Sequence, residues 1–197
     1  MTVLDIHVLG SPLLRAETVA VTDFGDELQH LIDDMFQTMY AAEGIGLAAP
    51  QVGHTSRLAV LDVEKNPLVL INPEILSTEG SDKAEEGCLS IPDIFGDVER
   101  PKRVVVRALD RVGQPFEIDA SGLLGRALQH EIDHLHGKLF IDYLSFMKRR
   151  AALSKWESLK EKYPLLLRKL MPADGQRASA DDERSGRRAR RVEEEVL

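Results

Sequence analysis

The stretch SGLLGRALQHEIDHLHG, from Ser121 to Gly137, predicts the central element of this protein. Apolar residues recur in it at helical spacing, Ser121 is suited to begin a helix, and Gly137 is suited to end one. His130 and His134 are four positions apart, so both imidazoles lie on one helix face and can reach one metal ion. Glu131 then lies beside that metal, where a water binds. The pattern predicts a metal-dependent hydrolase.

A catalytic site of this kind usually has three protein ligands and one open position. A third histidine six residues after His134 would complete the metzincin arrangement, but that position is Phe140. A downstream glutamate would complete another arrangement, and Glu157 and Glu161 are the candidates, although their lysine-rich segment reads as a solvent-facing helix. The better candidate is the single cysteine, Cys88, because its thiolate suits a soft or borderline metal and the preceding glycine permits close backbone approach.

Three segments together resemble the signature motifs of the peptide deformylase family. They are GIGLAAPQVG at residues 44–53, EGCLS at residues 86–90 and QHEIDHLHG at residues 129–137. Their order and spacing fit the family, and the resemblance covers roughly residues 3–165. It implies an enzyme that removes the formyl group from the N-terminal formyl-methionine of new bacterial or organellar polypeptides and releases formate.

The resemblance also implies the metal ligands. In the family, one cysteine and two histidines hold the metal, and they map onto Cys88, His130 and His134. The usual metal is iron(II), and zinc(II), nickel(II) or cobalt(II) can occupy the same site. One divalent cation with a thiolate and two neutral imidazoles keeps a net positive charge, which lowers the pKa of a bound water and polarises the formyl oxygen.

Three further residues are expected to take part in catalysis. Glu131 would take the proton of the attacking water and later pass it to the leaving amine. The resemblance implies that the side-chain amide of Gln51 and the backbone N–H of Leu89 donate to the oxyanion of the tetrahedral intermediate. Because glutamine cannot ionise, it donates without changing the charge of the metal site.

The glycine-rich motif is expected to offer a backbone edge to the substrate. Gly44 and Gly46 flank Ile45 at a turn after an amphipathic helix. A phosphate-binding loop is excluded because no Lys-Ser/Thr pair follows and no complete Gly-x-Gly-x-x-Gly is present. An extended peptide can pair with this edge, as in strand addition, with Gly46 against the formyl-methionine backbone. Glu86 and Gly87, from the second motif, are also placed among the substrate-binding residues.

A pocket for the methionine side chain is expected on the metal-binding helix. Ala127 and Arg126 lie one turn before His130, and Leu123 lies two turns before it. We expect Leu123, Ala127 and the stem of Arg126 to wall this pocket, with Ile45 facing them. The guanidinium of Arg126 has an alternative place at the rim, near the peptide.

Hydrophobic patterns predict an α+β fold, with antiparallel β-sheets around the central metal-binding α-helix and a C-terminal helix. An amphipathic helix is expected over residues 23–40, after an irregular segment at 12–20. The C-terminal helix is expected over residues 146–171, with a break at Pro164. Runs rich in β-branched residues predict strands at 57–63, 69–76, 84–90, 103–110 and 115–119.

Composition agrees with a soluble cytoplasmic enzyme, and neither a membrane nor DNA is expected as a partner. We expect one catalytic domain over residues 1–171 and a disordered, charged tail over residues 172–197. The single cysteine excludes an internal disulfide framework. The N-terminus has no basic stretch before an apolar run, so no signal peptide is expected. No run of apolar residues is long enough to predict a membrane span.

Charge is distributed unevenly along the chain. Residues 1–145 carry 11 basic and 24 acidic side chains, a net charge of −13, whereas residues 146–171 carry 8 basic and 2 acidic ones, a net charge of +6. The predicted C-terminal helix is therefore a basic element on an acidic protein. One interpretation is a solvated helix face. The other is docking to ribosomal RNA near the exit tunnel, which suits an enzyme acting on nascent formyl-methionyl chains and has a precedent in the family.

Two other functions remain open from the residues alone. One is a thermolysin-like metallopeptidase with Glu157 or Glu161 as third ligand. The other is a ribosome-binding protein with a structural metal, which four protein ligands would favour. The identity of the metal also stays open, because nitrogen and sulfur ligands suit several ions.

Overall fold

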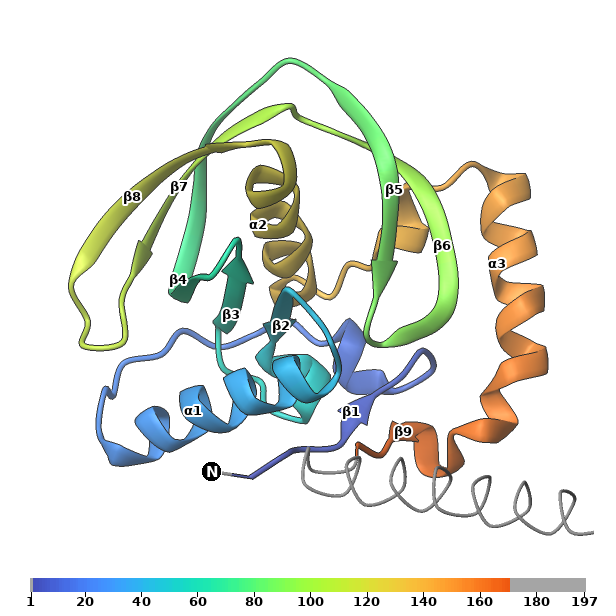
Figure 1. The fold of residues 1–197 in the computed structure, drawn as a ribbon, viewed down its shortest axis with the longest axis horizontal. Helices are drawn as coiled ribbons and strands as arrows, with labels where there is room; N and C mark the ends of the chain where they lie inside the picture. Colours follow the sequence, from blue (N-terminus) through green and yellow to red (C-terminus); the bar gives the residue numbers. More distant parts are fainter. Residues whose placement is uncertain (1, 171–197) are drawn as a thin grey trace, which may run out of the picture.

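Helix α2 (Gly122–Leu135) runs through the centre of the computed structural model, which describes residues 2–170 (Figure 1). The predicted tail at residues 172–197 lies outside the described residues. The other helices are α1 (Asp26–Ala41) and α3 (Phe146–Leu159). The strands are β1 (Ile6–His7), β2 (Gly46–Ala48), β3 (Leu58–Val63), β4 (Asn66–Glu79), β5 (Asp82–Cys88), β6 (Ile91–Arg100), β7 (Arg103–Leu109), β8 (Pro115–Ser121) and β9 (Leu167–Arg168).

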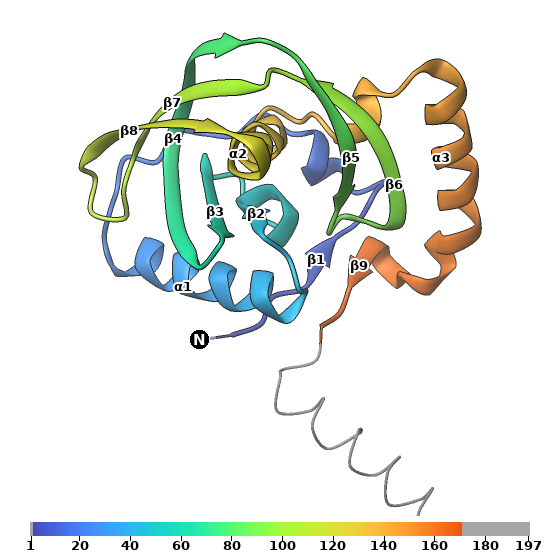
Figure 2. The same cartoon turned by 45° about the horizontal axis from the view of Figure 1, so that its top comes forward.

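The strands form antiparallel sheets on both sides of α2. The largest has the order β2-β3-β4-β7-β8, while β5 pairs with β6 and β1 pairs with β9. Figures 1 and 2 show the large sheet on one side of α2 and the β5–β6 pair on the other. The predicted α+β fold, with antiparallel sheets around a central helix, is therefore confirmed.

A long two-stranded ribbon connects the two sides. In its first strand, pairing with β7 ends at Glu79, and pairing with β6 resumes at Asp82. Gly80, which has a left-handed φ of 66°, lies at this break, and Pro101 lies between the two partner strands. A left-handed residue and a residue without an N–H both interrupt a strand ladder. The ribbon bends there and passes over α2 (Figure 1), which brings the end of β5 back to the helix.

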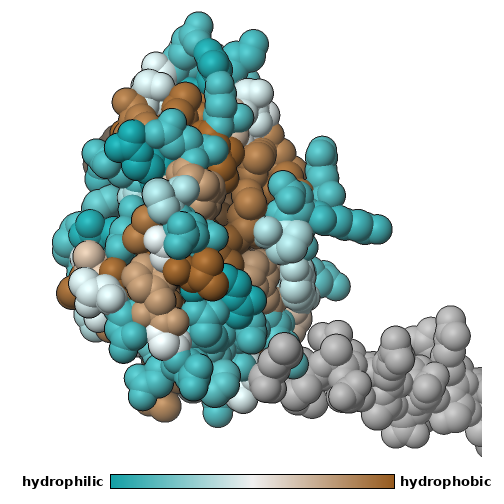
Figure 3. Space-filling model, turned by 90° about the vertical axis from the view of Figure 1, so that its left-hand side faces the viewer, coloured by the Kyte–Doolittle hydropathy of each residue, from teal (hydrophilic) through white to brown (hydrophobic). Residues whose placement is uncertain are grey.

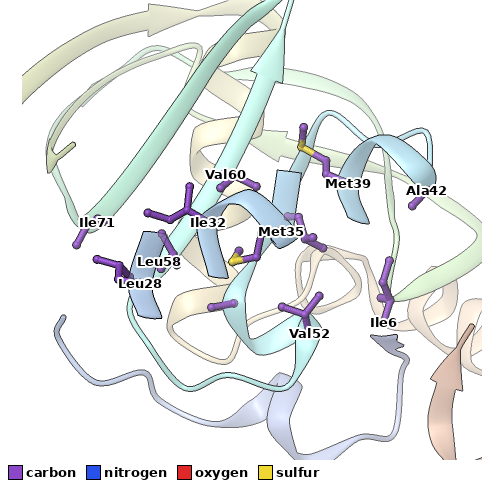
Figure 4. Packing of buried hydrophobic residues seen from close by; sticks show 12 residues of the cluster. Ile6, Leu28, Ile32, Met35, Met39, Ala42, Val52, Leu58, Val60 and Ile71 are labelled. Atoms are coloured by element: carbon purple, nitrogen blue, oxygen red, sulfur yellow. The ribbon is translucent and has the colours of Figure 1, made fainter. Parts of the chain in front are cut away.

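Helix α1 packs its predicted apolar face on the large sheet. The fully or nearly buried residues of this face are Leu28, Ile32, Met35 and Met39. They pack with apolar side chains of β3 and β4, including Leu58, Val60 and Ile71 (Figure 4). Burying one such side chain stabilises the fold by about 2 kcal/mol. The methionines of this helix, Met35 and Met39, are core residues.

Helix α2 begins and ends close to the predicted positions. Ser121 is its N-cap, with extended backbone, and Gly137 follows its last turn with a left-handed φ of 66°. A Cβ at Gly137 would also lie 2.7 Å from the carbonyl oxygen of Arg15. Within the helix, a Cβ at Gly125 would lie 3.0 Å from the carbonyl oxygen of Ala120. This close packing on the end of β8 explains a glycine that costs a helix about 1 kcal/mol relative to alanine.

The predicted C-terminal helix over residues 146–171 is wrong in extent. Helix α3 ends before Pro164, and Leu165 and Leu166 have left-handed φ values of 60° and 58° that no α-helix can include. The chain then returns to the body of the protein as β9, which pairs with β1. We call residues 160–170 the return segment.

Several large apolar side chains reach the surface. Figure 3 shows hydrophobic residues gathered across the middle of one face, with hydrophilic residues around them. Ile45, Phe95 and Leu123 are 42%, 63% and 56% exposed, and all three line one cavity. No helix within the described part of the chain is both long enough and apolar enough to cross a membrane.

Candidate metal centre

Three potential metal ligands from two elements meet at one point. Cys88 ends β5, and His130 and His134 lie on one face of α2. The sulfur of Cys88 is 3.2 Å from Nε2 of His134, and the two imidazole centroids are 5.0 Å apart. One ligand atom from each of the three residues lies within 4.8 Å of the others. The structure therefore brings the three predicted ligands together.

This donor set fits a divalent transition metal. A thiolate and two imidazoles are ligands that iron, zinc, nickel and cobalt all accept. Nδ1 of His130 lies 3.0 Å from a carboxylate oxygen of Glu86, so its Nε2 is left for the metal. His134 turns its Nε2 toward Cys88. Three protein ligands leave one position open, as catalysis requires.

The other candidate ligands lie elsewhere. The position of a third metzincin histidine is occupied by Phe140, which is buried and stacks on His130 with ring centroids 6.5 Å apart. Glu157 is exposed on α3 and paired with Lys160, and Glu161 is exposed in the turn that follows. Neither glutamate belongs to the ligand cluster, so the thermolysin-like arrangement is wrong. A fourth ligand, which a structural metal site would favour, is absent from this cluster in the described part of the chain.

Glu86 supports the first histidine ligand. Its buried carboxylate accepts hydrogen bonds from Arg100 at 2.6 and 3.0 Å and from Arg126 at 2.7 Å, besides its contact with His130. Burial raises the pKa of Glu86, but the hydrogen bonds from His130 and Arg100 outweigh it and lower the pKa to about 2. A charged carboxylate at this position fixes the tautomer and orientation of the imidazole. Glu86 was predicted to bind substrate, yet its oxygens are engaged behind the ligand.

Arg100 is an important residue of the site that sequence reasoning missed. It is 4% exposed, binds both Glu86 and Asp133, and lies over the ring of Tyr143 at 4.8 Å from the centroid. No motif marks it, because in the sequence it is one charge among several after an apolar run. Removing one partner of such a buried set costs about 3–5 kcal/mol, since the other charge is left unpaired.

Glu131 is buried beside the ligands and against β2. It is 4% exposed, and its Oε2 has no hydrogen-bond partner in the described part of the chain. A Cβ at Gly46 would lie 2.3 Å from Oε1, so the glycine makes room for the carboxylate. Burial raises the pKa of Glu131 to about 7, against the opposing charges of His130 and Arg100. A carboxylate with such a pKa and a free oxygen can accept a proton from water.

Gln51 and Leu89 lie beside the cysteine ligand. Gln51 is 2% exposed, and its Oε1 accepts a hydrogen bond from the N–H of Ala48 at 2.8 Å. This bond turns Nε2 toward Cys88, 3.6 Å from the sulfur. Leu89 follows Cys88 in the β5–β6 turn and packs on Gly44, where a Cβ would lie 2.7 Å from Cδ1 of the leucine.

A cavity of about 700 Å³ opens onto the metal ligands. Every residue predicted to act in catalysis or substrate binding lines it, together with two of the ligands: Ile45, Gly46, Gln51, Glu86, Gly87, Cys88, Leu89, Leu123, Arg126, Ala127, His130 and Glu131. The third ligand, His134, is 1% exposed and does not line the cavity. The volume of the cavity and its mixed polar and apolar lining suit the end of a peptide.

Arg126 lies in the cavity wall with its guanidinium engaged. Besides the carboxylate of Glu86, it donates to the carbonyl oxygen of Val98 at 3.0 Å and to Asp82 at 3.0 Å. These bonds attach the helix to β5 and β6. The stem of Arg126 is therefore available to wall a pocket, while its guanidinium is held by protein groups.

Further cavity residues were absent from the sequence-based set. Phe95 is exposed and rests on Gly87, where a Cβ would lie 2.7 Å from its ring. Tyr163 and Arg168 come from the return segment. The sequence-based prediction placed both in the C-terminal helix over residues 146–171, and the observed reversal of the chain is what brings them to the cavity.

Known proteins resemble this chain closely. Residues 3–150 match the family model of polypeptide deformylase. The chain is 52% identical over 163 residues to a peptide deformylase of Alkalilimnicola ehrlichii, covering 81% of this chain and 92% of that protein. It is 50% identical over 159 residues to peptide deformylase 2 of Vibrio cholerae, covering 79% of this chain and 94% of that protein.

Solved structures of peptide deformylases have the same fold as this chain. A crystal structure of a peptide deformylase from Legionella pneumophila superposes with a TM-score of 0.77 at 48% identity, covering 83% of this chain and all of that chain. A peptide deformylase from Synechococcus elongatus, in complex with actinonin, gives a TM-score of 0.75 at 49% identity, covering 77% of this chain and 85% of that one.

Proposed function

Since this chain belongs to the peptide deformylase family, we propose specific roles for the residues around its metal centre in the hydrolysis of N-terminal formyl-methionyl peptides. One observation carries these roles: the Cys88, His130 and His134 cluster lies at a cavity whose wall includes the buried Glu131. The reaction adds water across the formyl C–N bond and yields formate and a free amino terminus.

We propose that the cluster holds iron(II) in the cell. A metal bound there supplies positive charge that lowers the pKa of water and polarises the formyl carbonyl. Anaerobic purification followed by elemental analysis should find one iron per chain in the native protein and none in Cys88→Ala. Stoichiometric zinc in a protein with full activity would contradict the choice of iron.

The proton transfers are assigned to Glu131. Its unpartnered Oε2 takes the proton of the attacking water, and the same carboxyl group then gives a proton to the departing amine nitrogen. Gly46 leaves room for this carboxylate, because a Cβ at that position would lie 2.3 Å from Oε1.

The oxyanion is assigned to two donors. Nε2 of Gln51 and the backbone N–H of Leu89 stabilise the charge that develops on the formyl oxygen. The hydrogen bond from the Ala48 N–H to Oε1 fixes the orientation of the Gln51 amide. Removing one such donor typically costs about a hundredfold or more in kcat.

The substrate is assigned to the open side of β2. This strand is at the edge of the large sheet, so an extended peptide can pair with Ile45 and Gly46. The methionine side chain then enters the part of the cavity walled by Leu123, Ala127 and the stem of Arg126.

Formate release tests the whole assignment. Protein purified anaerobically with iron should release formate from a formyl-Met-Ala-Ser amide. Glu131→Gln should keep its metal and lose this activity. Absence of release by the native protein with its metal intact would overturn the proposal.

We further propose that the enzyme works in the cytoplasm on chains leaving the ribosome, as one catalytic domain over residues 1–171, and that α3 docks to ribosomal RNA. Support comes from the net charge of +6 in residues 146–171, and from Phe146 and Met147, which are 76% and 70% exposed beside this charge. Phosphate contacts would be made by exposed lysines and arginines of α3.

The docking test must leave the fold intact. Trp156 of α3 is 4% exposed and belongs to the core, so deleting the helix would disturb the protein. Arg150→Glu on α3, combined with Lys162→Glu in the basic turn that follows it, changes exposed charges only. These changes should reduce co-sedimentation with ribosomes at low salt, whereas Lys65→Glu in the β3–β4 turn should not. Equal co-sedimentation of all variants would contradict docking.

A further inference from the structure

The substrate cavity continues beyond the metal centre to the return segment. Tyr163 and Arg168 line it there, together with Asp93 from β6. Arg168 pairs with Ile6 in the β1–β9 ladder, so its backbone is fixed by a strand partner. Figures 1 and 2 show β9 beside β1 after the chain has turned back from α3.

The guanidinium of Arg168 has no hydrogen bond or ion pair within residues 2–170, although the residue is half-buried. The other arginine in the cavity wall, Arg126, is engaged by Glu86 and Asp82. A partly desolvated guanidinium is stabilised by an anion, and its planar donors match a carboxylate in bidentate geometry.

Tyr163 offers a second donor beside it. Its ring is held by stacking on Trp156, with centroids 5.7 Å apart and planes at 16°. Burial and the charge of Asp93 raise the pKa of Tyr163, while the charge of Arg168 opposes them. The phenol is therefore protonated at neutral pH, and it interacts electrostatically with both Asp93 and Arg168.

Arg168 is a positive charge among acidic residues of the cavity wall. The other charged residues that line the cavity away from the metal ligands include Glu43, Glu85 and Asp93, all acidic. Asp93 and Arg168 do not form an ion pair with each other, so the cation is available to a ligand.

We propose that Arg168 and the hydroxyl of Tyr163 form a subsite for a carboxylate side chain of the substrate, downstream of the formyl-methionine. The inference rests on the deformylase function. An extended peptide advances about 3.3 Å per residue, so successive residues pass along the cavity from the metal centre toward the return segment. An acidic residue that reaches Arg168 is bound there, and the enzyme favours peptides that carry it.

The test compares peptides that differ only in charge. Formyl-Met peptides of five residues, amidated at the C-terminus, carry Glu, Gln or Lys at the second, third or fourth position. At one position the native enzyme should prefer Glu over Gln about fivefold in kcat/KM, equivalent to about 1 kcal/mol, mainly through KM. Lys should be the poorest, and added salt should reduce the preference.

Variants identify the residue responsible. In Arg168→Ala the Glu/Gln ratio should fall to about one, and Arg168→Lys should keep part of it, because lysine retains the charge but not the bidentate geometry. Lys169→Ala is the matched control, since Lys169 is exposed and does not line the cavity, and it should keep the native ratio.

Two results would overturn the subsite: a native ratio near one at every position, or an unchanged ratio in Arg168→Ala. The uncharged Gln peptide reports deformylation by itself. Its failure to react would therefore count against the proposed function, whereas a flat ratio with a reactive Gln peptide counts against the subsite alone.

Discussion

Glu86 joins the metal centre to the two arginines behind it. It contacts His130 on one side and accepts hydrogen bonds from Arg100 and Arg126 on the other. The orientation of one metal ligand therefore depends on residues that never touch the metal. Such outer contacts typically change metal affinity by about ten- to a hundredfold.

Glu86→Gln should lower metal affinity by about ten- to a hundredfold. The neutral amide holds the His130 imidazole less strongly, and it removes the negative charge that pairs with Arg100. Competition with a chelator measures the affinity. Glu85→Gln is the control, since Glu85 is exposed and is not bonded to a ligand. Equal affinities in the two variants would contradict this role.

Gly46→Ala should lower kcat about a hundredfold, because the new Cβ would lie 2.3 Å from Oε1 of Glu131 and force the carboxylate to move. The metal content should not change, since the atoms nearest to the new Cβ all belong to Glu131, which is not a metal ligand. Gly25→Ala, at the exposed start of α1, serves as the control and should keep its kcat. A Gly46→Ala enzyme with native kcat would show that Glu131 does not need this space.

The motifs revealed the residues that do chemistry, and the structure revealed those that support them. Cys88, His130 and His134 have ligand chemistry that a sequence displays directly. Arg100 could not be predicted, because its importance comes from burial between Glu86 and Asp133, far apart in the chain.

At the scale of elements, helices α1 and α2 follow hydrophobic periodicity, and the short or irregular strands do not. Strand β6 contains Pro92 and Gly96, which usually argue against a strand, yet it pairs with β5 along the ribbon. Strands β1 and β9 have two residues each and produce no alternation to detect. The return segment was missed for the same reason, since its path depends on a partner 160 residues earlier in the chain.

Asp142 ties three elements together. Its carboxylate binds Arg15, accepts from the N–H of Leu139 at 2.9 Å, and lies 3.2 Å from Arg149 on α3. Burial raises the pKa of Asp142, but the hydrogen bonds from Arg15 and Leu139 outweigh it and lower the pKa. Its contribution to stability is therefore present above the unfolded pKa, about 3.9, and is lost as pH falls through the lower folded value.

Asp142→Asn should reduce the free energy of unfolding by about 1 kcal/mol at pH 7, and the difference should shrink as the native carboxylate protonates in acid. Urea denaturation at pH 7 and pH 3 measures both values. Glu117→Gln, which breaks an exposed pair with Arg107, should change stability by only a few tenths of a kcal/mol. A pH-independent difference for Asp142→Asn would contradict the assignment.

At the scale of the whole molecule, the hydrophobic core is formed by apolar side chains, so we expect the fold to form without the metal. Hydrophobic clusters pack α1 against β3 and β4, the large sheet against α2, and α3 against β6. Of the three ligand residues, Cys88 packs at the edge of the α3–β6 cluster. A metal held by Cys88, His130 and His134 would join the end of β5 to α2. Metal removal should therefore lower Tm while leaving one cooperative transition, because a ligand that binds only the folded state adds stability without creating the fold.

The measurement that tests the central claim most directly is an anaerobic titration of metal-free protein with iron(II), followed by formate release from a formyl-methionyl peptide. One Cys88, His130 and His134 site per chain predicts no release at the start, a linear rise, and a break at one metal per chain. Release by the metal-free protein, a break at another stoichiometry, or a fully loaded protein that releases no formate would contradict it.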